Sequence, residues 1–450
     1  MNATKDLTQG NPVKLILQFS FPVFLGYLFQ EFYHTFDTII VGRLLGSYAL
    51  AAVGSTSPLV FLVFGFTQGT TQGFAVLTAQ SFGAKNDKAL KFSIASNIIL
   101  NTSLTIIVTV TALITAKPIL KIINTPENIF NQSYTYIFVI YAGIGASILY
   151  NACACILRSL GDSKTPLLFL IISSISNIIL DFIFIKYLYV MGAALATVIA
   201  QLFSGIGCFI YIYKKFPNLH LSKKDFYISF NILRQHMKIG IPMGFQFSIT
   251  AIGSIILQSA LNNFGAFAIA GFSSAQKVEH LITTAANTIG VTCANFTGQN
   301  IGVKNIFRVR QGVKTCIYIS IICCAFSMFI ALVFPNQLTS LFVSENETGY
   351  TEILRYAKEF LFWCSLCFFP LYCIFIFRNT LQAMGFALIP LLGGVTELLA
   401  RSIIAYTLPL FLGYTGICLA SSIAWILTSL LLIISYSIIV KKHFTNRRIN

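Results

Sequence analysis

The stretch PVFLGYLFQEFYHTFDTIIV, residues 22–41, decides the class of this protein, because it is long enough to cross a bilayer and yet carries ionisable side chains. Gln30, His34 and Asp37 fall on one side of a helix, and Glu31 lies just beside them. A carboxylate near the middle of a membrane helix costs at least about 2.5 kcal/mol. We therefore expect this polar stripe to face a water-filled cavity or a partner inside a helix bundle.

The rest of the chain is strongly apolar. Of its 450 residues, 56% are hydrophobic and 10% are charged, and the mean hydropathy is +0.79. Apolar runs longer than about 18 residues recur from end to end. This pattern predicts an all-α integral membrane protein with twelve transmembrane helices, at residues 14–41, 49–79, 90–115, 129–157, 166–186, 190–213, 234–261, 268–297, 306–333, 352–382, 388–410 and 414–440.

The formal net charge of +16 is explained by membrane topology. Most Lys and Arg residues fall in alternate connections between the predicted helices, as the positive-inside rule demands of a protein with both termini in the cytoplasm. We therefore expect a multi-pass protein of the cell membrane, in contact with lipid and without a nucleic-acid partner. The eleven cysteines all fall within predicted helices, where apolar packing is their expected role, so we predict no metal centre beyond a Na⁺ site.

An internal repeat runs through the chain. LGSYALAAVG (45–54) recurs as FGAFAIAGFS (264–273), LRSLGDSKTPLL (157–168) matches LQAMGFALIPLL (381–392), and Pro22 corresponds to Pro242. Each copy holds six predicted helices, an even number, so both copies enter the membrane in the same orientation as a parallel repeat. The repeat predicts an N-lobe at 1–213, a cytoplasmic linker at 214–233 and a C-lobe at 234–450.

Proline and glycine positions indicate where helices bend and where they touch. Pro22 removes one backbone hydrogen bond early in the first helix, which predicts a hinge, with a static kink as the alternative. Gly65, Gly69 and Gly73 line one face of the second helix at i, i+4 spacing. They predict the close approach of another helix.

Two polar residues also interrupt the fifth predicted helix. Asn177 and Asp181 are one helical turn apart in the run SISNIILDFIF and therefore share a face. Together with Asp37 they offer two carboxylates and an amide oxygen, a set that suits Na⁺ or the exchange of a proton. A structural hydrogen-bonded pair that locks two helices together is the alternative.

At these residues the chain resembles the multidrug and toxic compound extrusion (MATE) family of efflux transporters. The resemblance is carried by Pro22, Gln30 and Asp37 in the first helix and by several short motifs along the chain. These motifs are VGRLLG (41–46), LAAVG (50–54), AQSFGAKN (79–86), RSLGDSKTP (158–166), Asn177 with Asp181, GAALAT (192–197) and GQNIG (298–302).

The resemblance implies a two-lobe bundle around a central cleft and cation-coupled drug export. It also implies a cation site of Asp37, Asn177, Asp181 and Thr197, the last provided that the connection between the fifth and sixth helices is two residues shorter than usual. Another branch of the family has functional acids in helices 7 and 10, and this chain has neither. The difference favours DinF-like coupling in the N-lobe, with Gln30, Glu31 and His34 expected to contact substrate or to modulate the proton affinity of Asp37.

The C-lobe carries charges of its own. Glu397 and Arg401 are four residues apart, and an ion pair within one helix is the simplest interpretation, with substrate contact as the alternative. Lys277 and Glu279 are two residues apart and cannot face each other on one helix. Glu279 is therefore a candidate contact for cationic substrates.

Two classes of transport are compatible with the sequence. The favoured function is secondary active export of small amphipathic, often cationic, organic compounds by antiport with Na⁺ or H⁺, through alternating access of two lobes. The alternative is a flippase of a lipid-linked saccharide precursor, which predicts a basic cleft. An enzyme is not expected, because neither a Walker loop nor a Ser-His-Asp arrangement is recognisable. We expect a monomer that needs no cofactor besides the coupling ion.

Overall fold

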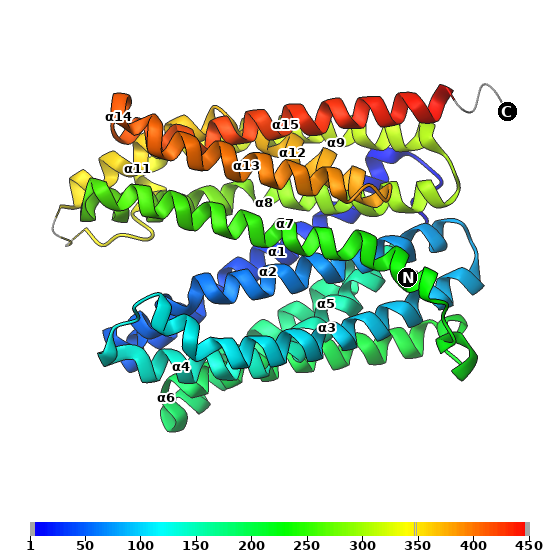
Figure 1. Cartoon of the computed structure of the whole chain (residues 1–450), viewed down its shortest axis with the longest axis horizontal. Helices are drawn as coiled ribbons and strands as arrows, with labels where there is room; N and C mark the ends of the chain where they lie inside the picture. Colours follow the sequence, from blue (N-terminus) through cyan, green and yellow to red (C-terminus); the bar gives the residue numbers. More distant parts are fainter. Residues whose placement is uncertain (1–4, 346, 348, 446–450) are drawn as a thin grey trace. The chain divides into compact units, whose positions relative to one another are not determined.

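The computed structural model describes residues 5–345, 347 and 349–445, without the side chains of His34, Ser47 and residues 443–445. The regular elements of this part are all helical. In chain order (Figure 1) they are α1 (Pro12–Leu45), α2 (Ser47–Gly83), α3 (Asp87–Ile122), α4 (Glu127–Ala142), α5 (Ile144–Ser159), α6 (Lys164–Lys215), η1 (Pro217–Leu219), η2 (Lys223–Phe226), α7 (Phe230–Leu261), η3 (Asn262–Phe264), α8 (Ala266–Gly302), α9 (Ile306–Val333), α10 (Pro335–Thr339), α11 (Tyr350–Ser365), α12 (Phe368–Ala383), α13 (Leu388–Thr407), α14 (Pro409–Leu412) and α15 (Tyr414–Thr445).

These helices match the twelve predicted spans. Within the described part, eight helices are long and apolar enough to cross a membrane, and the pairs α4–α5 and α11–α12 each pass as one bent span. α6 supplies two spans, because it folds back on itself at Tyr189. α8 has 37 residues and is long enough to cross, although Lys277, Glu279 and His280 lower its hydropathy. The predicted all-α membrane fold is confirmed.

The fifth and sixth predicted helices are joined by a single non-helical residue. Tyr189 has φ 53° and ψ −133° inside the 52-residue α6. Ser173 Oγ donates to the carbonyl of Ala200 (2.8 Å), and Ser204 Oγ donates to that of Phe169 (2.9 Å), so the two halves lie antiparallel. Their register places Asn177 opposite the turn that carries Thr197.

Two predicted helices are broken, contrary to our expectation of single helices at 129–157 and 352–382. α4 and α5 meet at an angle of 43° at Gly143, and α11 and α12 meet at 54°. A Cβ at Gly143 would lie 2.2 Å from Val198 Cγ2, so glycine lets α6 pack into the break. The apolar pattern runs through both breaks, because both halves of each span are buried in the same bundle.

The chain forms two compact units. The N-terminal unit centres on Gln18–Ser248 and also takes in the segment before Asn11 and Gly298–Lys304, the last turns of α8. The C-terminal unit comprises Asn11–Leu17, Ile249–Thr297 and the chain from Asn305 onward. α1, α7 and α8 therefore each contribute to both units.

Packing against α2 and α3 explains why the first half of α7 belongs to the N-terminal unit. A Cβ at Gly73 would lie 2.4 Å from Gly240 Cα, and one at Gly69 would lie 2.6 Å from the Met243 carbonyl oxygen. The close approach predicted from these glycines is confirmed. His236, which is buried, also pairs through Nε2 with Ser93 Oγ at 3.0 Å.

The ends of α2 and α8 show the internal repeat directly. A Cβ on Gly83 would lie 2.0 Å from the Gln299 carbonyl oxygen, and one on Gly302 would lie 2.0 Å from the Gln80 carbonyl oxygen. Gln80 corresponds to Gln299, and Gly83 to Gly302, in the repeat. Equivalent residues therefore pack reciprocally, backbone against backbone.

The same end of α8 holds the N-terminal segment. Leu7 is buried, and its N–H donates to Gln299 Oε1 at 2.8 Å. Asn300 Nδ2 donates to the Leu7 carbonyl at 3.2 Å, and Gln299 Nε2 donates to the Ser159 carbonyl at 3.0 Å. The buried amides of the GQNIG motif thus fasten the segment that precedes α1 to the end of α5.

We predict that Gly302→Ala destabilises the protein by about 1–3 kcal/mol, because the new methyl group meets backbone atoms that cannot rotate away. Thermal unfolding of the purified protein measures the effect. Gly54→Ala is the matched control, because Gly54 lies in α2 with no atom near its Cβ position. That control should be neutral or slightly stabilising. Equal melting temperatures for the two variants would contradict the close packing of α2 and α8.

Candidate functional site

Two segments of the N-terminal unit bring the predicted cation-site residues together. Asp37 comes from α1, Asn177 and Asp181 come from the first half of α6, and Thr197 comes from its second half. Asn177 and Asp181 have no exposed surface, and Asp37 is 9% exposed. The antiparallel hairpin of α6 explains the arrangement, because it returns Thr197 to the level of Asn177.

A pair of carboxyl groups forms the centre of this site. Asp37 and Asp181 lie within hydrogen-bonding contact of each other. Among the described residues, Asp37 Oδ1 is buried and has no hydrogen-bond partner. Two carboxylates in contact in a poorly solvated site repel one another strongly, so a shared proton or a bound cation is needed to stabilise them. The described His, Cys, Asp and Glu side chains form no cluster of three that suits a multivalent metal.

Two tyrosines complete the site, and sequence reasoning missed both. Tyr33 of α1 is hydrogen-bonded to Thr197, whose Oγ1 lies 3.1 Å from the Ala193 carbonyl oxygen. Tyr136 of α4 is buried and lies close enough to both aspartates to interact with their charges. Tyr33 precedes Asp37 by one helical turn, and that spacing was a usable signal.

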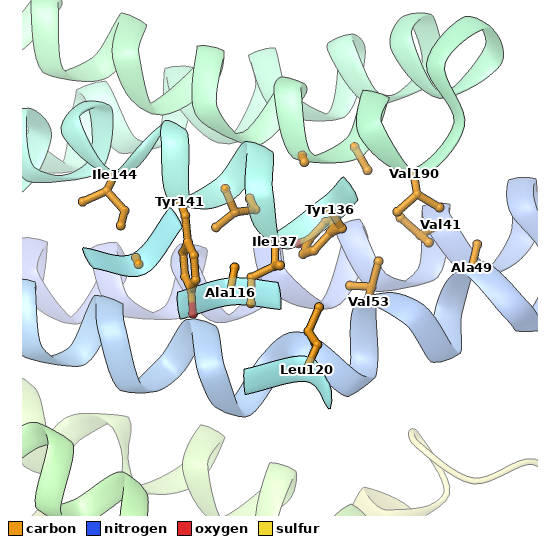
Figure 2. Close-up of a cluster of buried hydrophobic side chains, with 14 of the residues drawn as sticks. Val41, Ala49, Val53, Ala116, Leu120, Tyr136, Ile137, Tyr141, Ile144 and Val190 are labelled. Carbon is orange, nitrogen blue, oxygen red and sulfur yellow. The ribbon is translucent and has the colours of Figure 1, made fainter. Parts of the chain in front are cut away.

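An apolar cluster of the N-terminal unit, part of which Figure 2 shows, includes residues next to the site. It draws side chains from all six helices α1 to α6. Val41 follows Asp37 by one turn, Ile185 follows Asp181 by one turn, and Ala193 precedes Thr197 by one turn, and all three belong to the cluster. The turns of α1 and α6 that flank the carboxyl pair are therefore packed among apolar side chains.

The other polar residues of the first helix lie elsewhere on α1. The buried positions of this part of α1 are Tyr33, Asp37, Ile40 and Val41, whereas Gln30 is half-buried and Glu31 is exposed. The His34 side chain lies outside the described residues. Pro22 is buried within an α1 that continues through it as a helix.

Four buried charges of the C-terminal unit lie close to one another. Arg401 Nη2 lies 2.6 Å from Glu397 Oε1 within α13, and both side chains are about nine-tenths buried. Glu279 of α8 is 7% exposed and close enough to Arg401 for their charges to interact. Arg378 of α12 similarly interacts with Glu397. Two acids and two arginines thus balance, while Lys277 is exposed and its Nζ lies 5.6 Å from the Phe342 ring centroid.

A bundle of membrane-spanning helices built from two parallel copies, with a buried carboxyl pair in one copy, defines a class of multi-pass membrane transporters. The sequence model of the MatE family matches residues 22–183 and again residues 242–407. The chain belongs to this family, the MATE efflux transporters, so the predicted resemblance is confirmed. The two matches begin at Pro22 and Pro242, the positions that the internal repeat pairs. The protein is a transporter and not an enzyme.

Named relatives and solved structures agree with this assignment. The chain is 28% identical over 384 residues to "Probable multidrug resistance protein YpnP" of Bacillus subtilis (strain 168), covering 84% of each chain. It is 29% identical over 341 residues to "Probable multidrug resistance protein YoeA" of the same organism, covering 74% of each. The fold resembles the structure "Outward-facing conformation of a multidrug resistance MATE family transporter of the MOP superfamily", with a TM-score of 0.91 at 22% identity, over 97% of this chain and 98% of that one.

Proposed function

We propose that this protein is a secondary active exporter of amphipathic, often cationic, organic compounds, driven by inward movement of Na⁺ or H⁺. The observation that carries the proposal is the buried contact between Asp37 and Asp181. Family membership supports the export of small molecules, and two Bacillus relatives are named as probable multidrug resistance proteins. We place it in the cell membrane as a monomer with both termini in the cytoplasm.

In the proposed cycle the carboxyl pair is the coupling site, as in a DinF-like transporter. A proton or Na⁺ that enters between Asp37 and Asp181 relieves their repulsion, and its departure restores it. Because Asp37 lies on α1 and Asp181 on α6, the occupancy of the site changes how tightly these helices pack. Asn177 supplies an amide to the site. The hydrogen bond between Tyr33 and Thr197 tethers α1 to the second half of α6.

The two sides of Asp37 along α1 differ. With the N-terminus in the cytoplasm, α1 runs outward, so Val41 and its neighbours lie on the outer side of Asp37. Pro22, on the opposite side of Asp37, supplies the hinge at which α1 bends during alternating access.

Substrate contacts are proposed from the remaining charged and polar residues. Gln30, Glu31 and His34 are candidate substrate or modulating residues on α1, and Glu279 is a candidate for attracting cationic substrates. The balance between Glu279, Glu397 and two arginines limits how much negative charge the C-terminal unit offers. Glu397 and Arg401 are assigned a structural role.

Ethidium accumulation tests the proposed function against the flippase alternative. Energised cells that produce the protein should accumulate less ethidium than cells that carry an empty vector, and an uncoupler that abolishes the ion gradients should remove the difference. Equal accumulation in both strains, at matched amounts of membrane protein, would exclude export of cationic drugs and favour the flippase.

A further inference from the structure

A pocket of about 320 Å³ lies between the beginning of α9 and the end of α15, in the C-terminal unit. It is lined by Arg310, Tyr436, Ser437, Val440 and Lys441. Two cationic side chains on different helices and two hydroxyl groups therefore surround one hollow. Arg310 is close enough to Tyr436 for its charge to act on the phenol.

The two helices that form the pocket carry no acidic residue. Neither Ile306–Val333 nor Tyr414–Thr445 contains Asp or Glu. Arg308, Lys314 and Lys442 add further positive charge to the same ends of these helices. A pocket in this setting favours an anionic group with several acceptor oxygens, and a phosphate diester is such a group.

The pocket lies near the ends of two membrane-spanning helices, and this position places it at the membrane surface. Arg310 lies in the second turn of α9 and Lys441 near the end of α15, whereas the middles of both helices are apolar. Exposed apolar side chains lie on the middle side of these charges, since Ile434 and Ile438 of α15 are 57% and 62% exposed, and Ile322 of α9 is 72% exposed. Ile434, Ile438 and Lys441 share one face of α15. A ligand with a charged head and apolar chains fits this arrangement of charge above exposed hydrocarbon.

We propose that the pocket lined by Arg310, Tyr436, Ser437 and Lys441 binds the phosphate headgroup of an anionic phospholipid, whose acyl chains lie along the exposed apolar faces of α9 and α15. The basic side chains attract the phosphate diester, and the Tyr436 hydroxyl donates a hydrogen bond to it, whereas the Ser437 hydroxyl donates to the Ile433 carbonyl at 2.8 Å. The pocket belongs to the C-terminal unit and the carboxyl pair to the N-terminal unit, and lipid binding does not depend on the proposed antiport.

Native mass spectrometry of the full-length protein, titrated with phosphatidylglycerol, tests the proposal. Arg310→Gln with Lys441→Gln should weaken phosphatidylglycerol binding about fivefold for each lost charge and roughly thirtyfold for both. Phosphatidylcholine binding should not change. Lys223→Gln with Lys224→Gln is the matched control, because it removes the same charge from η2, and it should leave phosphatidylglycerol binding unchanged. Arg310→Lys with Lys441→Arg keeps the charges and should retain binding.

Two results would overturn the proposal. Equal phosphatidylglycerol affinity in the Arg310→Gln, Lys441→Gln variant and in the η2 control would show that the pocket does not hold the headgroup. Displacement of phosphatidylglycerol by glycerol 3-phosphate at equal concentration would show that the acyl chains contribute nothing, and the pocket would then be a site for soluble phosphate compounds.

Discussion

Asp37→Asn and Asp181→Asn are each expected to give a folded protein that no longer couples drug export to a cation. Asn keeps the shape of Asp and one acceptor oxygen, but it cannot take up a proton or neutralise Na⁺. The buried pair then carries at most one charge, so the repulsion that cation entry relieves is gone. In the wild-type protein, an inward cation gains about 2.3 kcal/mol per charge per 100 mV from the membrane potential. Without coupling this energy no longer drives export, and the attainable drug gradient falls about fiftyfold.

Drug resistance and ethidium efflux in cells measure this effect, normalised to the amount of protein in the membrane. Asp87→Asn is the matched control, because Asp87 is an exposed acid at the start of α3 in the same unit. It should keep wild-type export. Asn177→Ala should lower export less than either aspartate variant. Full export by Asp181→Asn at wild-type protein levels would show that the pair is structural.

Arg401→Ala is expected to destabilise the protein by about 3–5 kcal/mol, because it leaves the nearly buried Glu397 carboxylate without the guanidinium 2.6 Å away. Glu397→Gln combined with Arg401→Gln should recover much of the loss, since neither side chain then carries a charge. The yield and thermal stability of monodisperse protein in detergent report the difference.

An exposed ion pair of the same kind provides the comparison. Arg355 Nη2 lies 2.8 Å from Glu352 Oε2 on α11, with both side chains at least half exposed. Arg355→Ala should therefore cost no more than about 1 kcal/mol. If the Arg401→Ala protein had normal stability and lost only transport, Glu397 and Arg401 would have a role in transport and not a structural one.

The sequence predicted the carboxyl pair because a buried acid in a membrane helix stands out against an apolar background. Asp37, Asn177 and Asp181 were found in this way. Tyr33 and Tyr136 were missed, since tyrosine is common in membrane helices and carries no such signal by itself. Helical spacing from Asp37 identifies Tyr33, but Tyr136 becomes a neighbour only through the packing of α4.

The sequence predicted the positions of the membrane-spanning segments but not the breaks inside them. Repeat and hydropathy located twelve segments, because each must be apolar over the thickness of a bilayer. The breaks at Gly143 and before Phe368 leave hydropathy unchanged and were not predicted. Likewise, the GQNIG motif contributed to the family resemblance. Its sequence did not indicate that Gln299 and Asn300 form hydrogen bonds with the backbone of Leu7.

Drug movement in proteoliposomes under a single imposed ion gradient tests the coupling role of the carboxyl pair most directly. The wild-type protein should accumulate drug against its gradient when Na⁺ or H⁺ is supplied from the opposite side, and lose that accumulation when the gradient is absent. The Asp37→Asn, Asp181→Asn double variant should bind drug but carry it only down its gradient, whichever ion is imposed. Accumulation by the double variant that stays fully cation-dependent would contradict the account.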